Sequence, residues 1–249
     1  MKHTGYEPLN TLKPLADDIW LIDAPHVKFY GLPFSTRCVV VRLASGGLWV
    51  HSPTMLTEEL KAELAALGPV EHLIAPNWIH YVSVKDWQAA YPEAVAWAAP
   101  GVVARAASRN VEIAFDHDLG AEAEAVWAGE IGQLIVTGSK VHSEAVFFHQ
   151  SSCTLILTDL IENFEASKMP LWLGPLMWLG GVLAPNGGMP RDMRASFGKH
   201  KDVLRGHIMT MLTWAPERVI VSHGAWFEHD GAAELRRAFD WLGLSEEGS

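Results

Sequence analysis

Four short apolar runs in the sequence are each followed by a side chain that can bind a metal ion or move a proton. These side chains are His51, His80, Asp159 and His223. Imidazole and carboxylate groups are common ligands of zinc and similar divalent ions, and both also transfer protons in catalysis. In layered α/β folds the strand ends form the crevice where ligands bind, because the loops there carry polar groups while the strands hold them in place. We therefore expect these four side chains to meet at one site.

Each of these residues also has a purely structural interpretation. A single histidine after a strand, such as His51, is more often hydrogen-bonded within the fold than bound to a ligand. Asp159 precedes a chain reversal and can cap the segment that follows. His223 is a stronger candidate, because Gly224 after it leaves room for a ligand beside the backbone. Repetition of the pattern at four strand ends favours function more than any single instance does.

Other histidines and other catalytic motifs are less informative. His142 and Glu144 lie just before another apolar run and are either ligands of the same site or part of a solvated loop. The glycine-rich phosphate loops, the G-x-S-x-G elbow and the H-E-x-x-H helix are absent from the sequence. Ser222 cannot act as a nucleophile with His223 as its base, because adjacent residues of a strand point to opposite faces.

Short strands that alternate with amphipathic helices must position the candidate residues. The clearest helix covers residues 56–67, where leucines follow helical spacing, Thr57 is an N-cap and Gly68 ends the helix. Further helices are expected at 85–91, 202–212 and 232–242. Strands are expected at 19–22, 37–42, 48–50, 72–75, 94–98 and 218–222, with a turn at 31–33 and a meander at 134–136, 145–149 and 154–158. This alternation predicts an α/β architecture and one domain over residues 1–249.

The composition excludes several classes of protein. The chain has 249 residues, of which 49% are hydrophobic, and its formal net charge is −10. A sizeable core is therefore expected, and the acidic balance argues against nucleic acid as a partner. Residues 1–14 carry no signal-peptide pattern, so a cytoplasmic location is expected. Cys38 and Cys153 lie in apolar runs and are expected to be buried thiols, with a single disulfide as the alternative.

An apolar insert rich in Trp, Gly and Pro occupies residues from about 168 to 197 and is expected to be irregular. Its most apolar part, 171–184, is shorter than the ~17 to 25 residues of a spanning helix, so no membrane span is expected. As a lid over the site, Trp172 and Trp178 would suit an apolar or aromatic small-molecule substrate. The alternatives are a part of the core and a contact in a homodimer.

The order of the strand-end groups resembles that of the metallo-β-lactamase superfamily, and the local motifs resemble its DUF4336 branch. The motifs are L-W-V-H-S-P at 48–53, L-G-P-V-E-H-L-I-A-P-N-W-I-H at 67–80, D-W-Q-A-A-Y-P at 86–92, E-A-V-F-F-H at 144–149, T-L-I-L-T-D-L at 154–160 and V-S-H-G at 221–224. The resemblance covers residues from about 10 to 243. It implies an α/β (α+β) fold of four layers, an αββα sandwich in which two sheets pack between helices.

The principal metal-binding motif of the superfamily is altered in this chain. Typical members carry H-x-H-x-D-H after the second strand, and this motif supplies ligands to two metals. The corresponding stretch here is N-W-I-H-Y-V at 77–82. Asn77 stands at the first His and Tyr81 at the Asp, while Ile79 and Val82 stand at the other two His and cannot coordinate a metal. His80 is displaced from all four positions.

The other superfamily positions are better preserved. The resemblance aligns Asp159 with the bridging Asp and His223 with the final His. It aligns His51 with an Asp that orients ligands. It also places His142 near the His of the third motif, although aligning the following strand instead places Lys140 there.

The residues that remain predict one three-ligand metal site rather than a full two-metal site. His80, Asp159 and His223, with help from His142 or Asn77, would hold one divalent metal and leave a position open for water. Zinc is the expected metal, iron or manganese are alternatives, and a degenerate site would hold none. Asp159 and His80 would be catalytic, and the supporting or substrate-contacting residues would be His51, Asn77, Tyr81, Glu144, Trp172 and Trp178.

These residues predict a mononuclear metal-dependent hydrolase of an ester, thioester, lactone or similar bond in a small molecule. Two alternatives remain open. One is a metal-free member of the fold that binds a small molecule or another protein, and the other is an iron-dependent redox enzyme.

Overall fold

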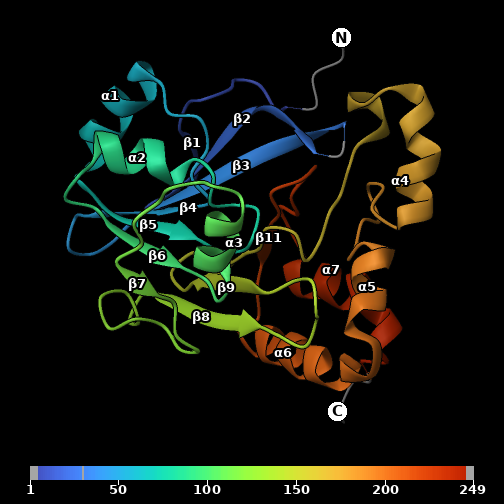
Figure 1. Ribbon diagram of the computed structural model, residues 1–249. Coiled ribbons are helices and arrows are strands. Elements are labelled where there is room, and N and C mark those ends of the chain that lie inside the picture. Colours follow the sequence, from blue (N-terminus) through green and yellow to red (C-terminus); the bar gives the residue numbers. More distant parts are fainter. Residues whose placement is uncertain (1–4, 30, 245–249) are drawn as a thin grey trace.

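The computed structural model describes residues 5–29 and 31–244, which form two β-sheets with helices on their outer sides (Figure 1). The first sheet has the order β1-β2-β3-β4-β5-β6-β7 and the second has the order β11-β10-β9-β8. The four layers are the αββα sandwich that the sequence motifs imply. The chain enters the second sheet only after completing the first.

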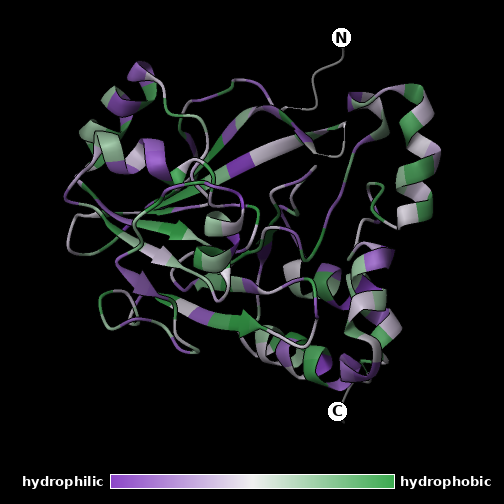
Figure 2. Cartoon of the chain, in the orientation of Figure 1, coloured by the Kyte–Doolittle hydropathy of each residue, from purple (hydrophilic) through white to green (hydrophobic). Residues whose placement is uncertain are grey.

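The first sheet changes from antiparallel to parallel pairing at β4. Its strands are β1 (Lys13–Ala16), β2 (Ile19–Phe29), β3 (Leu32–Arg42), β4 (Leu48–His51), β5 (Val70–Ala75), β6 (Val95–Ala98) and β7 (His117–Asp118). β1 to β4 are antiparallel neighbours, whereas β4 to β7 run parallel. The parallel strands are joined by α1 (Glu58–Leu67), α2 (Val84–Ala90) and α3 (Val102–Ser108), because parallel neighbours need a crossover connection. Figure 2 shows apolar β5 beside these helices of mixed hydropathy.

The second sheet consists of a meander and one parallel strand. Its strands are β8 (Ile131–Val136), β9 (Glu144–His149), β10 (Thr154–Ile156) and β11 (Arg218–Ile220), and β11 is parallel to β10. The helices after β10 are α4 (Gly174–Gly180), α5 (Arg191–Phe197), α6 (Lys201–Thr213) and α7 (Gly231–Ala238). Buried residues of α6 and α7 pack with the face of the second sheet that points away from the first.

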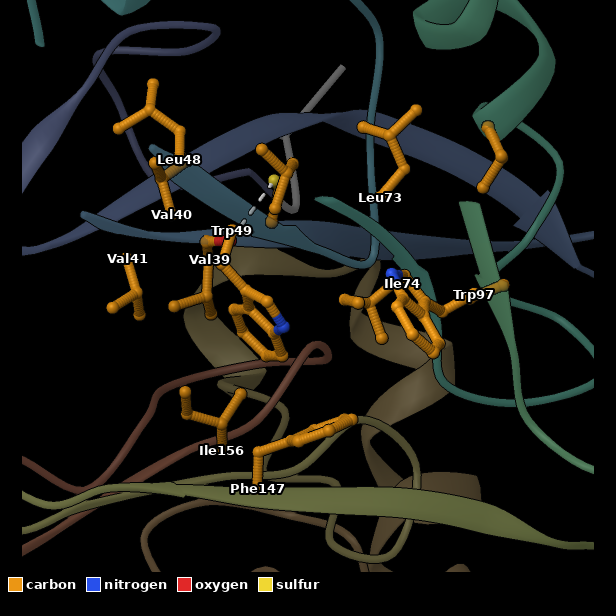
Figure 3. Close-up of a cluster of buried hydrophobic side chains, with 14 of the residues drawn as sticks. Val39, Val40, Val41, Leu48, Trp49, Leu73, Ile74, Trp97, Phe147 and Ile156 are labelled. Carbon is orange, nitrogen blue, oxygen red and sulfur yellow. Dashed lines mark hydrogen bonds between the residues drawn. The ribbon is translucent and has the colours of Figure 1, made fainter. Parts of the chain in front are cut away.

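The main core lies between the two sheets, and the alternation of side chains along each strand determines which residues enter it. In β9, Ala145 and Phe147 join this core, whereas Val146 and Phe148 join the core beneath α6 and α7. Figure 3 shows Trp49, Ile74 and Trp97 pointing from the first sheet toward Phe147 and Ile156 of the second. The two sheets therefore share one apolar layer. All the strands predicted from the sequence are present.

Several local expectations need correction. The predicted turn at 31–33 extends two residues too far, because Leu32 and Pro33 already belong to β3. The insert at 168–197 is not irregular but contains α4 and α5. Pro175 is compatible with α4 because proline is tolerated in the first helical turn.

The cysteines match their prediction only in part. Both are free, and Cys38 is buried. Cys153 is half-buried and lies in the turn before β10, where its backbone adopts a φ of 49°. The alternative of a disulfide is thereby removed, and the expectation of two buried thiols holds for Cys38 alone.

Replacing Thr57 with alanine is expected to lower the free energy of unfolding by about 1 kcal/mol. The Thr57 side chain accepts a hydrogen bond from the backbone N–H of Leu60 at the start of α1. Without it, that amide loses its capping partner. Urea unfolding of Thr57→Ala and Thr57→Ser measures the effect, and equal losses in both variants would contradict a capping role.

Candidate metal centre

Three of the four strand-end candidates meet at one edge of the two sheets. His80 lies in the turn after β5, Asp159 follows β10, and His223 follows β11. His223 Nε2 is 2.9 Å from Asp159 Oδ1, and His80 Nε2 is 3.3 Å both from that oxygen and from His223 Nε2. All three side chains are at most 7% exposed. Together they form a candidate metal-binding group, which we call the HDH cluster.

Hydrogen bonds at Nδ1 of both histidines determine which ring nitrogen carries the proton. His223 Nδ1 is 2.6 Å from the carbonyl oxygen of Ser35, which can only accept, so the Nδ1–H donates to it. His80 Nδ1 is 2.7 Å from Ser52 Oγ. The Ser52 hydroxyl donates to the carbonyl oxygen of Arg37 at 3.2 Å, so its oxygen accepts from His80. In their neutral forms, both rings therefore present the Nε2 lone pair to the centre of the cluster.

This donor set fits a divalent metal ion. Two imidazole lone pairs that face each other at 3.3 Å, beside a carboxylate, need a cation to hold them together. In a tetrahedral zinc site with bonds of about 2.0 to 2.1 Å, neighbouring ligand atoms lie about 3.4 Å apart. The 2.9 to 3.3 Å separations in the HDH cluster are close to that spacing. Nitrogen and oxygen donors of this kind suit zinc, iron or manganese.

Asp159 is held in place by Asn77, which lies in the loop after β5, and by Glu144, the first residue of β9. Asn77 Nδ2 donates to Asp159 Oδ2 at 2.7 Å, while Asn77 Oδ1 accepts from the backbone N–H of His80. Glu144 is fully buried, and its carboxylate accepts the backbone N–H groups of Thr158 and Asp159 at 2.7 and 2.9 Å. Asn77 thus connects Asp159 with His80, and Glu144 fixes the backbone of Asp159.

His142 and Glu144 also lie close to Asp159. His142 Nε2 is 3.2 Å from Glu144 Oε2, and both side chains are buried. With Asp159 they form a second group whose ligand atoms lie within 4.8 Å of one another. Both oxygens of Glu144 already accept backbone hydrogen bonds, so this group is less open to a metal than the HDH cluster.

The charges of the HDH cluster stabilise one another before any metal binds. Burial raises the pKa of Asp159, but the charge on His80 and hydrogen bonds from both histidines hold it well below its usual value. Burial lowers the pKa of His223, but the hydrogen bond and the charge of Asp159 outweigh this effect and raise it. The Asp159 carboxylate and the His223 ring therefore stabilise each other, and a metal would compete with protons for these groups.

Glu162 is a titratable neighbour that the sequence did not single out. Burial raises its pKa to about 8; the charge on His223 opposes this rise, and the charge of Asp159 adds to it. Near neutral pH the Glu162 carboxyl therefore retains a proton that it can donate. The signal in the sequence that points to Glu162 is its position three residues after Asp159, in the same loop.

His51 does not have the expected role. Its ring stacks on Trp49 and meets Phe147 edge-on, inside the core between the sheets. Neither of its ring nitrogens has a hydrogen-bond partner among the described residues. The next residue, Ser52, orients His80 instead. The reason is the alternation along β4, which places His51 on the same inward face as Trp49.

Tyr81, Trp172 and Trp178 take no part in the hydrogen bonds and ring contacts described above for the HDH cluster. Tyr81 is buried and belongs to the main core. Trp172 and Trp178 are 61% and 67% exposed. Ile79 and Val82, which replace the histidines of the superfamily motif, are 40% and 60% exposed.

Aromatic rings line the side of His223 that faces the insert. Phe34 contacts the His223 ring edge-on at a centroid distance of 5.1 Å, and Phe164 stacks on it at 6.2 Å. Ser35 is adjacent to Phe34 in β3, which explains why this strand both orients and shields the histidine. The sequence did not single out Ser35 or Phe164, because neither directly follows an apolar strand as the candidate ligands do. Their roles depend on contacts between distant segments.

Comparisons with known proteins agree with this architecture. The DIM-1 metallo-β-lactamase exposed to ceftazidime superposes with a TM-score of 0.66 and 15% identity over 94% of this chain and 97% of that chain. A metallo-β-lactamase from Erythrobacter litoralis with β-mercaptoethanol in its active site gives 0.65 and 12% over 94% and 96%. The FIM-1 enzyme from Pseudomonas aeruginosa in its mono-zinc form gives 0.62 and 11% over 94% of both chains. At such identities the likeness shows the fold alone.

The sequence comparisons identify the family. No curated protein sequence matches the chain. A family model described as a domain of unknown function (DUF4336) matches residues 16–172, which is more than half of the 249 residues. The chain has the metallo-β-lactamase fold and belongs to the DUF4336 family.

Proposed function

We propose that the protein is a mononuclear metal-dependent hydrolase whose metal is held by His80, Asp159 and His223. The observation that carries this proposal is the HDH cluster, in which three buried ligand atoms lie 2.9 to 3.3 Å apart. Zinc is the metal we propose first, with iron and manganese as alternatives. His142 is the candidate for an additional ligand, since its ring nitrogen lies within 4.8 Å of the Asp159 carboxylate.

The chemistry follows from the groups at this centre. When bound, a divalent metal supplies Lewis-acid chemistry, lowering the pKa of a water toward 7 and polarising a carbonyl oxygen. Asp159 and His80 sit at the reacting position, while Asn77 and Glu144 keep Asp159 oriented. The aromatic rings of Phe34 and Phe164 make one side of the centre apolar. We therefore propose esters, thioesters, lactones or similar bonds in small apolar molecules as substrates.

Elemental analysis of untagged protein tests the metal site directly. After incubation with Zn, Mn or Fe and removal of free metal, we expect one metal ion per chain in the wild type. Asp159→Ala and His223→Ala should retain less than a tenth of that amount, whereas the exposed His229→Ala should match the wild type. A wild-type content well below one ion per chain would refute the proposal.

Activity is tested separately with metal-loaded protein on a panel of aryl esters, thioesters and lactones. The wild type should hydrolyse at least one class, and Asp159→Ala should not. Full metal content without hydrolysis of any class would remove the hydrolase assignment but leave the metal site intact.

Replacing Ser52 with alanine is expected to weaken metal binding about 10- to 100-fold, because His80 Nδ1 then loses the acceptor that orients the ring. Competition with a coloured chelator measures the affinity. Ser108→Ala is a matched control, since Ser108 is exposed at the end of α3. Unchanged affinity in Ser52→Ala would show that the ring is oriented by other contacts.

The altered superfamily motif favours a second candidate, a metal-free protein that binds a small molecule or another protein. Ile79 and Val82 offer no ligand where typical members of the superfamily have histidines. Absence of bound metal in the elemental analysis would support this candidate. An iron-dependent redox enzyme is distinguished from both by iron content together with oxygen consumption in the presence of thiol substrates.

A further inference from the structure

The turn between β9 and β10 brings a histidine and two serines into one chain of hydrogen bonds. His149 is the last residue of β9, and the turn that follows it covers residues 150–153. His149 Nε2 lies 3.2 Å from Ser151 Oγ, and His149 Nδ1 lies 2.8 Å from Ser152 Oγ. The His149 ring is 3% exposed, whereas Ser151 is exposed to solvent. A buried imidazole therefore contacts an accessible hydroxyl group.

The neighbouring hydroxyl groups determine the direction of each hydrogen bond in this chain. The Thr154 hydroxyl donates to the carbonyl oxygen of Ser152 at 3.1 Å, so the Thr154 oxygen accepts from the Ser152 hydroxyl at 2.8 Å. Because the Ser152 hydroxyl has no second proton, its oxygen accepts from His149 Nδ1–H. In the neutral ring, Nε2 then carries the lone pair and accepts the hydroxyl proton of Ser151. The three residues are thus arranged as a nucleophile, a base and a group that orients the base.

His149 is in the protonation state that a general base requires. Burial lowers the pKa of His149 below its ordinary value of 6.5, and the charges of Asp18 and Glu130 oppose this effect without cancelling it. The ring is therefore mainly neutral near pH 7. A neutral imidazole within hydrogen-bonding distance of a hydroxyl group can remove its proton as that group attacks a substrate.

A surface pocket of about 510 Å³ adjoins this turn through two of its lining residues, Glu217 and Arg218. Arg218 Nη1 donates to the carbonyl oxygen of Ser152 at 2.9 Å, and the backbone N–H of Glu217 donates to the carbonyl oxygen of Cys153 at 2.9 Å. Among the described residues, three carboxylates and one guanidinium line the pocket. The guanidinium also lies 3.6 Å from the Glu217 carboxylate. An acidic lining of this kind favours an uncharged substrate over an anionic one.

We propose that Ser151 is the nucleophile of a second hydrolytic site, which acts on small uncharged acyl esters with His149 as its general base. Ser151 Oγ attacks the ester carbonyl carbon, and its proton passes to His149 Nε2. His149 then gives this proton to the departing alcohol, which leaves the acyl group on Ser151. A water molecule next loses a proton to His149 and attacks the acyl carbon, and Ser151 Oγ leaves with that proton.

The remaining requirements of this reaction are met without a metal. The backbone N–H groups of Ser151 and Ser152 have no hydrogen-bond partner among the described residues, so they are free to stabilise the oxyanion. The site lies at the end of β9 opposite to Glu144, which contacts the backbone of Asp159. It is therefore separate from the HDH cluster.

A fluorophosphonate, which transfers its phosphonyl group to an activated serine and releases fluoride, tests the site in full-length untagged protein with a chelator present. We expect one phosphonyl group per chain, assigned to Ser151 by mass spectrometry of the digested protein. Ser151→Ala should carry none, and His149→Gln should react about 100-fold more slowly because it lacks the base. Ser108→Ala is the matched control, since Ser108 is also an exposed serine, and it should react like the wild type.

A second variant keeps the test decisive if His149→Gln does not fold. Ser152→Ala removes only the hydroxyl that orients the ring, and it should slow the reaction about tenfold. Absence of label on Ser151 in the wild type would overturn the proposal. Labelling of Ser151 at the wild-type rate in a folded His149→Gln or Ser152→Ala variant would overturn it as well.

Hydrolysis of p-nitrophenyl acetate separates this site from the metal centre. The chelated wild type should release nitrophenol in an initial burst of about one equivalent, which corresponds to acylation of Ser151. Ser151→Ala should lack this burst. A burst that the chelator abolishes would assign the hydrolysis to the HDH cluster and overturn the proposal. The metal-dependent activity proposed above is measured in the Ser151→Ala background, where the second site does not contribute.

Discussion

Replacing Arg37 with leucine is expected to lower the free energy of unfolding by about 3 to 5 kcal/mol, because it leaves a buried carboxylate without its principal partner. The Arg37 side chain is 1% exposed, and its Nε and Nη2 atoms contact Asp23 Oδ1 at 3.0 and 2.8 Å. Its Nη1 donates to the carbonyl oxygens of Val221 and Gly224. These two residues flank His223, so the same change should also loosen the loop that carries a ligand.

Urea unfolding of metal-free protein measures the stability effect, and chelator competition measures the effect on metal affinity. The double variant Arg37→Leu/Asp23→Leu is the informative control. It removes both charges, so we expect it to recover part of the stability that Arg37→Leu loses. A loss below about 1 kcal/mol in the single variant would show that the ion pair adds little to the fold.

Replacing His51 with leucine is expected to remove one source of the stability that the wild type loses as pH falls from 7 to 5. Burial, and secondarily the charge on His80, lowers the pKa of His51 to about 3. An unfolded histidine titrates near 6.5. Between these values the unfolded chain binds the additional proton, so the stability contributed by neutral His51 is complete above pH 6.5 and falls as pH decreases.

The size of the His51 effect follows from the same difference in pKa. At pH 5 the wild type should lose about 2 kcal/mol through this residue, and at pH 3 about 4 kcal/mol, using about 1.4 kcal/mol per pH unit and half protonation of the folded ring at pH 3. His223 and His142 carry raised pKa values and contribute in the opposite direction, as stability that is lost when pH rises. Comparing wild type with His51→Leu cancels their contribution.

Urea unfolding at pH 7.5 and 5.0, with a chelator present, provides the test for His51. His229→Gln is the control because His229 is exposed at the start of α7, and it should preserve the wild-type slope. Equal pH dependence in wild type and His51→Leu would mean that the buried ring accepts a proton in the folded protein.

No helix among the described residues is both long enough and apolar enough to cross a membrane. The apolar character of the insert was evident from its composition, but which of its side chains are buried was not. Leu173 and Met177 are buried, whereas Trp172 and Trp178 are exposed.

The strand-end pattern predicted that four side chains meet, and the structure brings three of them together. His80, Asp159 and His223 meet because β4 and β5, and β10 and β11, run parallel and end at the same edge. The pattern failed for His51 because a strand end indicates a position along the chain but not the face on which the side chain lies. The alternation that buries Trp49 also buries His51.

The sequence by itself determined the α/β class, most of the strands and the chemistry available, because local periodicity and residue type are properties of short segments. The tertiary structure alone decided which groups meet and how they are protonated. Ser35 and His223 are 188 residues apart, yet the carbonyl oxygen of Ser35 determines which nitrogen of His223 can bind a metal. Contacts of this kind depend on how the two sheets pack, and short segments carry no record of that packing.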